Sequence, residues 1–361
     1  MSNAQGPGRR RTLRSRLRLA AGSLGLALLL FFAAEGVVRL TSDLPLLGNS
    51  ATLFVPARFG SSSGNARDAT EVSFGQSVYL DGDGFRVPHL GYRSAATRAL
   101  LLVGDSVTFG PGVSEPETFA GRLRARLGSA NGGSSGAGSW NVLNAAVIGH
   151  AVPDYLNVVR TVLEERDDVA EVVLTYCLND LSAVSAQAIR AALAEREAVA
   201  PAPRSWVERL RSVAAFARLN ELLRERSKLY LLLRNSLTDP ARLFFAADLA
   251  LYERGEEVVF AELAPLAELA SLLRARAIRL TVVISPYAAQ VRALAPEQIE
   301  AALLPQRLVL GFLARHDIPA LDATETLRLL GPRAFLAYDP MHLSSVGHAA
   351  MEALLAAWIA Q

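Results

Sequence analysis

Two short segments, far apart in the chain, carry residue types that together could activate a hydroxyl group. Ser106 lies between glycines 104 and 110, just after an apolar run. Asp339 and His342 lie three residues apart near the C-terminus, with Pro340 between them. A serine hydroxyl becomes a nucleophile when a base takes its proton, and an imidazole that titrates near neutrality suits that task. A carboxylate must hold the imidazole in the right tautomer, and this spacing lets one short loop present both groups.

Each segment also has a simpler interpretation. The segment around Ser106 could be an ordinary strand-to-helix loop, with a side chain that caps the helix. Asp339 could likewise cap a helix, and His342 could be a surface residue. His348 is an alternative base, but it falls inside the predicted final helix, where we expect a packing or capping role. We therefore favour His342 as the base.

Two further residues offer hydrogen-bond donors. Attack on an ester places negative charge on the carbonyl oxygen, so donors must be in place to stabilise it. Asn179 follows the predicted strand 171–176 and offers a side-chain amide, whereas Gly149 follows the predicted strand 141–145 and offers an unobstructed backbone N–H. Asparagine and glycine are common in turns, so each alone says little. Ser106, Gly149 and Asn179 follow three successive predicted strands, and we expect them to converge at one edge of a sheet.

Predicted strands alternate with predicted helices from residue 98 onward. Residues 99–103 form a continuous apolar run that ends at a glycine, which is typical of a buried parallel strand. Further strands are expected at 141–145, 171–176, 279–284 and 318–321, and amphipathic helices at 118–127, 154–166 and close to the C-terminus. This alternation indicates βαβ units and an α/β fold with a central parallel sheet of about five strands.

The composition argues against several classes of protein. Apolar residues make up 51% and charged residues 20%, as in a globular protein with a sizeable core. The formal net charge is +2, but six arginines fall within residues 9–18, so the rest of the chain is mildly acidic. A nucleic-acid partner would need a basic face, and we expect none. Cys177 is the only cysteine and the five histidines are dispersed, so no metal-ligand spacing occurs. We expect neither a metal nor another cofactor.

The N-terminus has the pattern of a membrane segment. Residues 19–34 form an uncharged apolar run between the arginine cluster and Glu35, and extending the run through Val38 reaches the ~20 residues that span a bilayer. The length of the run and its basic flank predict an uncleaved signal anchor. Because the basic flank stays in the cytoplasm, residues 41–361 are expected to lie outside. Two alternatives remain open, a signal peptide cleaved near residues 34–36 and a buried helix of a soluble protein.

The chain divides into four predicted parts. Residues 1–18 form a basic cytoplasmic tail and residues 19–40 the transmembrane anchor. Residues 41–95, rich in Gly, Ser and Pro, are expected to form an extended segment with one short strand near 77–80. Residues 96–361 form the main domain. Within it, residues 182–256 interrupt the strand–helix alternation, and we interpret them as an insertion of two or three helices and a candidate cap over the site.

Four ordered segments resemble the SGNH hydrolase superfamily, also called GDSL-type esterases. They are Gly104-Asp105-Ser106, Gly149, Asn179-Asp180 and Asp339-x-x-His342, and the match covers residues 96–361 apart from the helical insertion. The resemblance implies a three-layer α/β/α sandwich of flavodoxin-like type. It also implies Ser106 as nucleophile, His342 as base and Asp339 as its orienting acid. The implied oxyanion hole consists of Ser106, Gly149 and Asn179.

The sequence departs from the family pattern at Cys177, which occupies the position of the glycine in the usual Gly-x-Asn-Asp block. A cysteine at the end of a buried strand is usually inert, so we do not interpret it as a nucleophile. Upstream, residues 79–86 resemble the Asn-x-x-Gly-Phe-Arg segment of membrane-anchored bacterial relatives, and we interpret Arg86 as structural. Two G-x-S-x-G matches, at 60–64 and 132–136, follow no apolar strand, so we interpret both as loops.

These observations lead to one favoured function and two alternatives. The favoured function is a serine esterase that acts through an acyl-enzyme, anchored in the bacterial inner (cytoplasmic) membrane with its catalytic domain in the periplasm. Its expected substrate is an acyl ester, with an envelope glycan or lipid as the candidate carrier. The first alternative is an O-acyltransferase that uses the same residues to acetylate a cell-envelope polysaccharide. The second is a non-catalytic SGNH scaffold used for binding.

Overall fold

The structure, a computed structural model, describes residues 8–42, 44–128, 139–181, 214–292 and 296–359. Eight strands form one sheet in the order β10-β9-β8-β6-β7-β5-β4-β3. The five parallel strands are β6 (Arg98–Gly104), β7 (Trp140–Asn144), β8 (Val169–Cys177), β9 (Arg279–Ser285) and β10 (Ala320–Asp322). In chain order they lie 2-1-3-4-5, the doubly wound arrangement of flavodoxin-like folds. The prediction of an α/β fold with a central, mostly parallel sheet is confirmed.

The centre of the core is strand β6, whose residues 99–103 are fully buried because helices cover both faces of the sheet. Helix α3 (Phe119–Gly128) packs against α15 (Ser345–Ile359), whereas α10 (Glu256–Ala275) packs against both α4 (Val152–Glu165) and α13 (Leu304–Arg315). The crossover through α3 runs from β6 to β7, and the one through α4 runs back across the sheet. Right-handed crossovers therefore place the two groups of helices on opposite faces.

Residues 41–95 differ from the predicted extended segment. Strands β5 (Arg86–Val87), β4 (Gln76–Leu80) and β3 (Ala69–Ser73) continue the sheet beyond β7 in antiparallel pairs. Strands β1 (Phe54–Phe59) and β2 (Ser62–Asn65) form a separate hairpin, so residues 60–64 are its turn and part of its second strand rather than a loop. The predicted strand at 77–80 corresponds to β4. Strands β2 and β3 are short and polar, as the Ser-Ser-Gly-Asn sequence of β2 illustrates, and give no clear apolar pattern.

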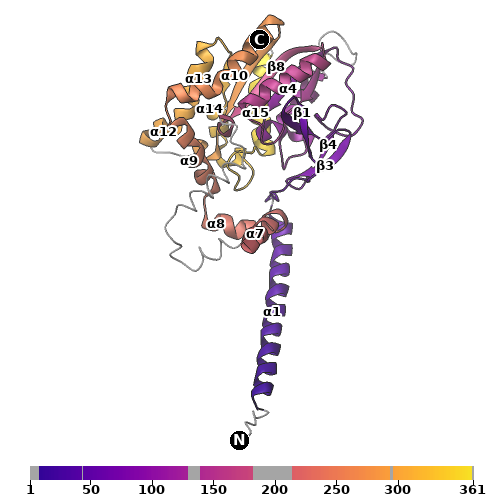
Figure 1. The fold of residues 1–361 in the computed structure, drawn as a ribbon, viewed down its shortest axis with the longest axis vertical. Helices are drawn as coiled ribbons and strands as arrows, with labels where there is room; N and C mark the ends of the chain where they lie inside the picture. Colours follow the sequence, from indigo (N-terminus) through magenta and orange to yellow (C-terminus); the bar gives the residue numbers. More distant parts are fainter. Residues whose placement is uncertain (1–7, 43, 129–138, 182–213, 293–295, 360–361) are drawn as a thin grey trace.

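The predicted insertion contains three helices in its described part, α7 (Ala214–Arg226), α8 (Lys228–Leu237) and α9 (Pro240–Tyr252). Residues 182–213, like the G-x-S-x-G match at 132–136, lie outside the described residues. Helix α9 packs where β8 ends, and the Tyr252 hydroxyl donates to the backbone oxygen of Leu178 at 2.9 Å. Helix α9 therefore contacts the carboxyl end of β8, and its role as a cap stays a prediction. Helices α7 and α8 lie instead at the end of the N-terminal helix α1 (Gly8–Thr41), between that helix and the body (Figure 1).

Helix α1 projects away from the body (Figure 1). Its segment Arg18–Thr41, 24 residues long, is apolar enough to cross a membrane, and only 11% of its most apolar window is buried. A helix of this length measures about 36 Å, against roughly 30 Å for the hydrocarbon core of a bilayer. This length and composition fit a signal anchor or a signal peptide.

Short helices connect the main elements. They are α2 (Ser106–Phe109), η1 (Glu115–Glu117), η2 (Leu178–Leu181), α11 (Ala288–Val291), α12 (Pro296–Ala302), α14 (Thr324–Arg328) and η3 (Gly331–Ala334). Two of them, α2 and η2, start directly after the parallel neighbours β6 and β8, so both begin at the carboxyl edge of the sheet.

Candidate active site

The serine segment turns sharply from β6 into α2. A side chain at Gly104 would clash with Oγ1 of Thr108, so the turn requires glycine there. Asp105 caps α2, because its Oδ1 accepts a hydrogen bond from the Val107 N–H at 2.8 Å. Ser106 is the first residue of α2 and only 6% exposed. Its hydroxyl is therefore held in one place at the carboxyl edge of the sheet.

The C-terminal segment folds around the Asp339 carboxylate. Its Oδ1 accepts hydrogen bonds from the backbone N–H groups of Met341 (2.9 Å) and His342 (2.7 Å), and its Oδ2 lies 2.8 Å from Nδ1 of His342. On the other side of the imidazole ring, Nε2 of His342 lies 2.9 Å from Oγ of Ser106. The structure thus brings together three of the residues singled out from the sequence, although 236 positions separate the serine from the histidine.

The electrostatic environment favours the protonated form of His342. Burial lowers the pKa of its imidazole, but the negative charge and hydrogen bond of Asp339, followed by the charge of Asp105, outweigh burial and raise the pKa above its usual value. A group with this arrangement can accept a proton from the serine hydroxyl and hold it as an ion pair with Asp339.

Asn179 lies beside the serine segment at the start of η2. Its Nδ2 donates to Oδ2 of Asp105 at 3.3 Å, and the same carboxylate oxygen lies 3.1 Å from Oγ of Ser106. An amide nitrogen carries two hydrogens, so one N–H of Asn179 remains for a further acceptor. Asp105 therefore holds the side chains of Asn179 and Ser106 close together. Burial raises the pKa of the Asp105 carboxyl group.

Gly149 lies in the turn that follows β7, at the same edge of the sheet. The backbone N–H of Val147 donates to the carbonyl of Gly104 at 3.2 Å, which ties this turn to the end of β6. Gly149 has φ of +86° and is exposed, and an added side chain would meet open space. Within the described part of the chain its N–H donates to no acceptor, and no direct hydrogen bond joins Gly149 to Ser106, His342 or Asn179.

Two residues that the sequence did not single out lie behind Asn179. The Tyr287 hydroxyl donates to Oδ2 of Asp248 at 2.5 Å and lies 3.4 Å from Oδ1 of Asn179. Asp248 belongs to α9, and burial raises the pKa of its carboxyl group to about 6. These side chains come from the helical insertion and from the segment after β9, so no local pattern could have identified them. Of the two, only Tyr287 contacts the amide of Asn179, on its oxygen rather than on the nitrogen that donates to Asp105.

An aromatic residue closes the other side of the imidazole. The ring of Phe74 meets that of His342 edge to face, with centroids 5.2 Å apart. Phe74 occupies the tip of the β3–β4 hairpin with φ of +49°, a conformation that costs a bulky residue about 1–3 kcal/mol. It also lines a cavity of about 760 Å³. Other lining residues are Leu44, Lys228, Arg333, Leu336 and Ser345.

Three other residues considered from the sequence, His348, Cys177 and Arg86, are buried and lie in the packed interior of the protein. Nδ1 of His348 accepts from the Phe119 N–H at 3.2 Å, and burial, with nearby arginines, lowers the pKa of this histidine to about 3. Cys177 is fully buried, and burial raises the pKa of its thiol well above the usual value. Arg86 is fully buried and donates to the carbonyls of Phe109 and Gly110, so it braces the segment that follows the serine.

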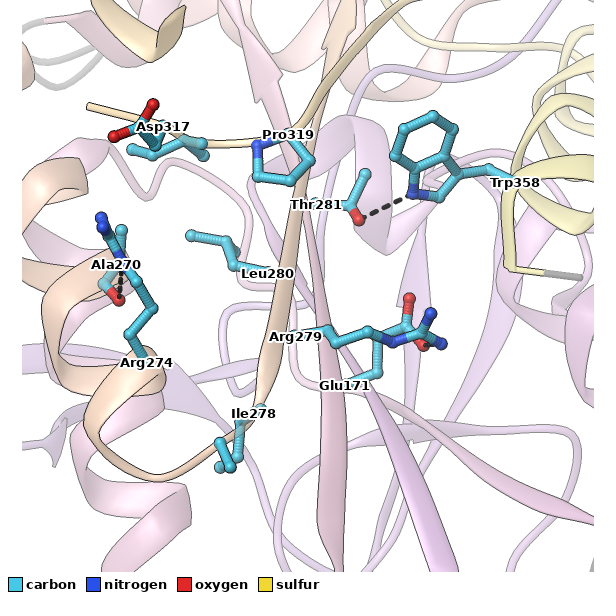
Figure 2. A pocket seen from close by; sticks show the side chains of 12 residues that line it. Glu171, Ala270, Arg274, Ile278, Arg279, Leu280, Thr281, Asp317, Pro319 and Trp358 are labelled. Carbon is cyan, nitrogen blue, oxygen red and sulfur yellow. Dashed lines mark hydrogen bonds and ion pairs between the residues drawn. The ribbon is translucent and has the colours of Figure 1, made fainter. Parts of the chain in front are cut away.

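A second cavity, of about 410 Å³, lies at the end of the sheet where β8 and β9 begin, opposite the serine, and Figure 2 shows its lining side chains. Arg279, the first residue of β9, and Glu171, near the start of β8, line it, and the Trp358 indole donates to Oγ1 of Thr281 at 2.9 Å. This cavity is separate from the serine and the histidine. Across the described ranges, no three or more His, Cys, Asp or Glu side chains gather as metal ligands.

Comparisons with known proteins find similarity at the level of structure. No protein-family model and no curated protein matches the sequence. The chain is similar to a member of the lipolytic protein G-D-S-L family from Veillonella parvula DSM 2008, with 14% identity over 71% of this chain and 96% of that chain and a TM-score of 0.38. It is also similar to an aryl esterase of M. smegmatis (13% identity, 73% and 98% coverage, TM-score 0.36) and to the acetyl xylan esterase AlAXEase (12%, 72% and 98%, 0.40).

Proposed function

We propose that this chain is a membrane-anchored serine esterase of the SGNH type that acts outside the cytoplasm. The observation that carries the proposal is the unbroken line of hydrogen bonds from Asp339 through both ring nitrogens of His342 to the Ser106 hydroxyl, at 2.8 and 2.9 Å. Such a line gives the serine a base and gives the base an orienting carboxylate. The raised pKa of His342 fits a group that must hold a proton during the reaction.

In the proposed reaction Oγ of Ser106 attacks the carbonyl carbon of the ester while Nε2 of His342 takes the hydroxyl proton. The carbonyl oxygen becomes an oxyanion, which accepts hydrogen bonds from the free N–H of Asn179 and the backbone N–H groups of Gly149 and Ser106. As the C–O bond to the alcohol breaks, His342 returns the proton to the leaving oxygen and an acyl-enzyme remains. Water then attacks the acyl carbon, again with His342 as base, and releases the acid and the serine.

The N-terminal helix is proposed as a retained anchor. Most of its 24-residue apolar segment is exposed, as expected of a helix that lipid covers, and an arginine cluster precedes it. With the basic end in the cytoplasm, the body of the protein lies outside. This location makes an acyl ester of the cell envelope the proposed substrate.

Turnover of a chromogenic acetyl ester by the full chain in detergent tests the proposal. We expect Ser106→Ala and His342→Ala each to lower kcat/KM at least ~10³-fold with an unchanged circular dichroism spectrum. Ser271→Ala, on the exposed side of α10, is the matched control and should keep the wild-type rate. A Ser106→Ala enzyme with wild-type turnover would rule out the mechanism.

A further inference from the structure

A carboxylate inside the apolar helix α1 is fully partnered by a distant part of the chain. Glu35 accepts hydrogen bonds from the hydroxyl of Ser227 (2.7 Å) and from the backbone N–H groups of Lys228 (3.0 Å) and Leu229 (2.9 Å), and it pairs with Arg39 at 2.7 Å. Glu35 is the only acid in α1. An unpaired carboxylate within a membrane helix is costly, so these bonds hold the start of α8 at the depth of Glu35.

Two further hydrogen bonds connect the segment between α7 and α8 to the end of α1. Arg39 donates to the backbone oxygen of Arg226 at 2.5 Å, and Nζ of Lys228 donates to the backbone oxygen of Ser42 at 3.0 Å. The end of α7, the start of α8 and the end of α1 therefore form one joint. In Figure 1 both helices extend from this joint beside the end of α1 nearest the body.

The position of the joint along α1 can be compared with a bilayer. The apolar segment of 24 residues is about 36 Å long, roughly 6 Å more than the hydrocarbon core. Sharing this excess between both ends puts the outer hydrocarbon boundary near Arg39, and Glu35 about 6 Å below it. Amphipathic helices that lie in a membrane surface bury their apolar side by about 5–10 Å. The start of α8 is therefore at the depth of such a helix.

The two helices present apolar side chains that the rest of the described chain leaves uncovered. On α8, Leu233 and Leu237 are 56% and 86% exposed and lie one helical turn apart. They lie opposite Leu231 and Asn235, which are buried. Helix α7 adds two more exposed leucines, so the exposed set consists of Leu219, Leu222, Leu233 and Leu237. A monomeric soluble surface seldom gathers large apolar side chains in this way.

The charges on the same helices complement a lipid surface. Five basic residues accompany the leucines, against two glutamates, Glu221 and Glu225. The basic residues are Arg218, Arg224, Arg226, Lys228 and Arg234. Basic side chains around an apolar face are typical of helices that bind anionic phospholipid.

We propose that α7 and α8 lie in the outer surface of the membrane, with their leucines among the lipid acyl chains and the guanidinium groups of Arg218 and Arg234 at the phosphates. The proposal rests on α1 being the retained anchor proposed above. Lys228 belongs to this joint and also lines the 760 Å³ cavity beside Phe74, so that cavity opens at the membrane surface. This cavity, lined by the Phe74 ring that contacts His342, then faces the lipid rather than the open periplasm.

Depth-dependent fluorescence quenching tests this placement in the full chain. The protein is reconstituted in nanodiscs of phosphatidylethanolamine and phosphatidylglycerol, with or without dibrominated lipids. Single-site variants Leu28→Cys, Leu222→Cys, Leu233→Cys and Leu329→Cys carry an environment-sensitive dye. All four side chains are at least 45% exposed, so the dye should not disturb packing, and the buried Cys177 should not react. Leu28 reports on the anchor, and Leu329, 87% exposed on the body, is the aqueous control.

We expect quenching at positions 222 and 233 to be at least three-fold that at position 329, and to be strongest with bromines near the headgroups. Strong quenching at position 28 with control-level values at both 222 and 233 would overturn the proposal and leave the anchor intact. Control-level quenching at position 28 as well would overturn the anchor together with the proposal. Neither result depends on ester turnover, so both are separable from the proposed chemistry.

Discussion

Replacing Asp339 with asparagine removes one negative charge and keeps the shape of the loop. The asparagine oxygen can still accept from the backbone N–H groups of Met341 and His342, which now bond Oδ1 at 2.9 and 2.7 Å. Its amide nitrogen, however, meets Nδ1 of His342 where a carboxylate oxygen lies 2.8 Å away. A hydrogen bond to a charged partner contributes about 1.5–3 kcal/mol. Its loss therefore lowers the pKa of His342.

The substitution also places a donor opposite Nδ1, which favours the tautomer with its proton on Nε2, facing Ser106. That tautomer cannot accept the serine proton, so we expect kcat to fall by about 10²–10⁴. The base must be neutral, and the raised pKa of His342 places the acid limb of kcat/KM above pH 6.5 in the wild type. In Asp339→Asn the residual activity should show this limb at lower pH.

Steady-state hydrolysis of an uncharged chromogenic ester from pH 5 to pH 9 measures both effects. Asp317→Asn is the matched control, because Asp317 is exposed and lies beside the cavity at the opposite end of the sheet. Its profile should overlie the wild type. An acid limb that stays in place in Asp339→Asn, with kcat within a few-fold of wild type, would refute the role of the carboxylate.

Three further predictions concern the surroundings of the site. Asn179→Ala should lower kcat by about 10²–10³ with little change in KM, since the oxyanion forms only during the reaction; a raised KM at unchanged kcat would contradict this. Asp248→Asn should reduce the loss of stability that accompanies a rise in pH from about 4 to 6. The pKa of Asp248 is raised from 3.8 to about 6, so ionisation of its carboxyl group destabilises the wild type over this range by at most about 3 kcal/mol. Urea unfolding at both pH values should show a larger loss in the wild type than in Asp248→Asn, and equal losses would contradict this. Gly104→Ala would bring a methyl group within 3.0 Å of the Thr175 carbonyl and should lower both activity and melting temperature, whereas Gly128→Ala, which meets open space, should change neither.

The parallel sheet could be predicted because its strands carry a local signal. Residues 99–103 are continuously apolar, and that pattern follows directly from burial on both faces. Ser106, Asn179 and Gly149 fall at one edge of the sheet because each follows a strand of that sheet. We expected His342 to lie close to Ser106 because a serine nucleophile needs a base beside it. In the structure Nε2 of His342 and Oγ of Ser106 are 2.9 Å apart.

The remaining features depend on contacts between distant residues and leave no local pattern. Tyr287 and Asp248 lie 39 positions apart, and only the packing of α9 brings them together. Strands β2 and β3 are short and polar, so their pairing partners rather than their composition define them. Glu35 interrupts an apolar run when read along the sequence, and its partner Ser227 lies 192 positions away. The sequence shows the charge of Glu35 but not that the start of α8 supplies its hydrogen-bond donors.

Reaction with a fluorophosphonate that labels only activated serine hydroxyls tests the central claim most directly. In the folded full chain we expect a single adduct, located on Ser106 by mass spectrometry of the peptides, and at least ~10²-fold slower labelling in His342→Ala. An unlabelled Ser106 in protein with a native circular dichroism spectrum, or equally fast labelling without the His342 imidazole, would contradict a serine activated by its histidine.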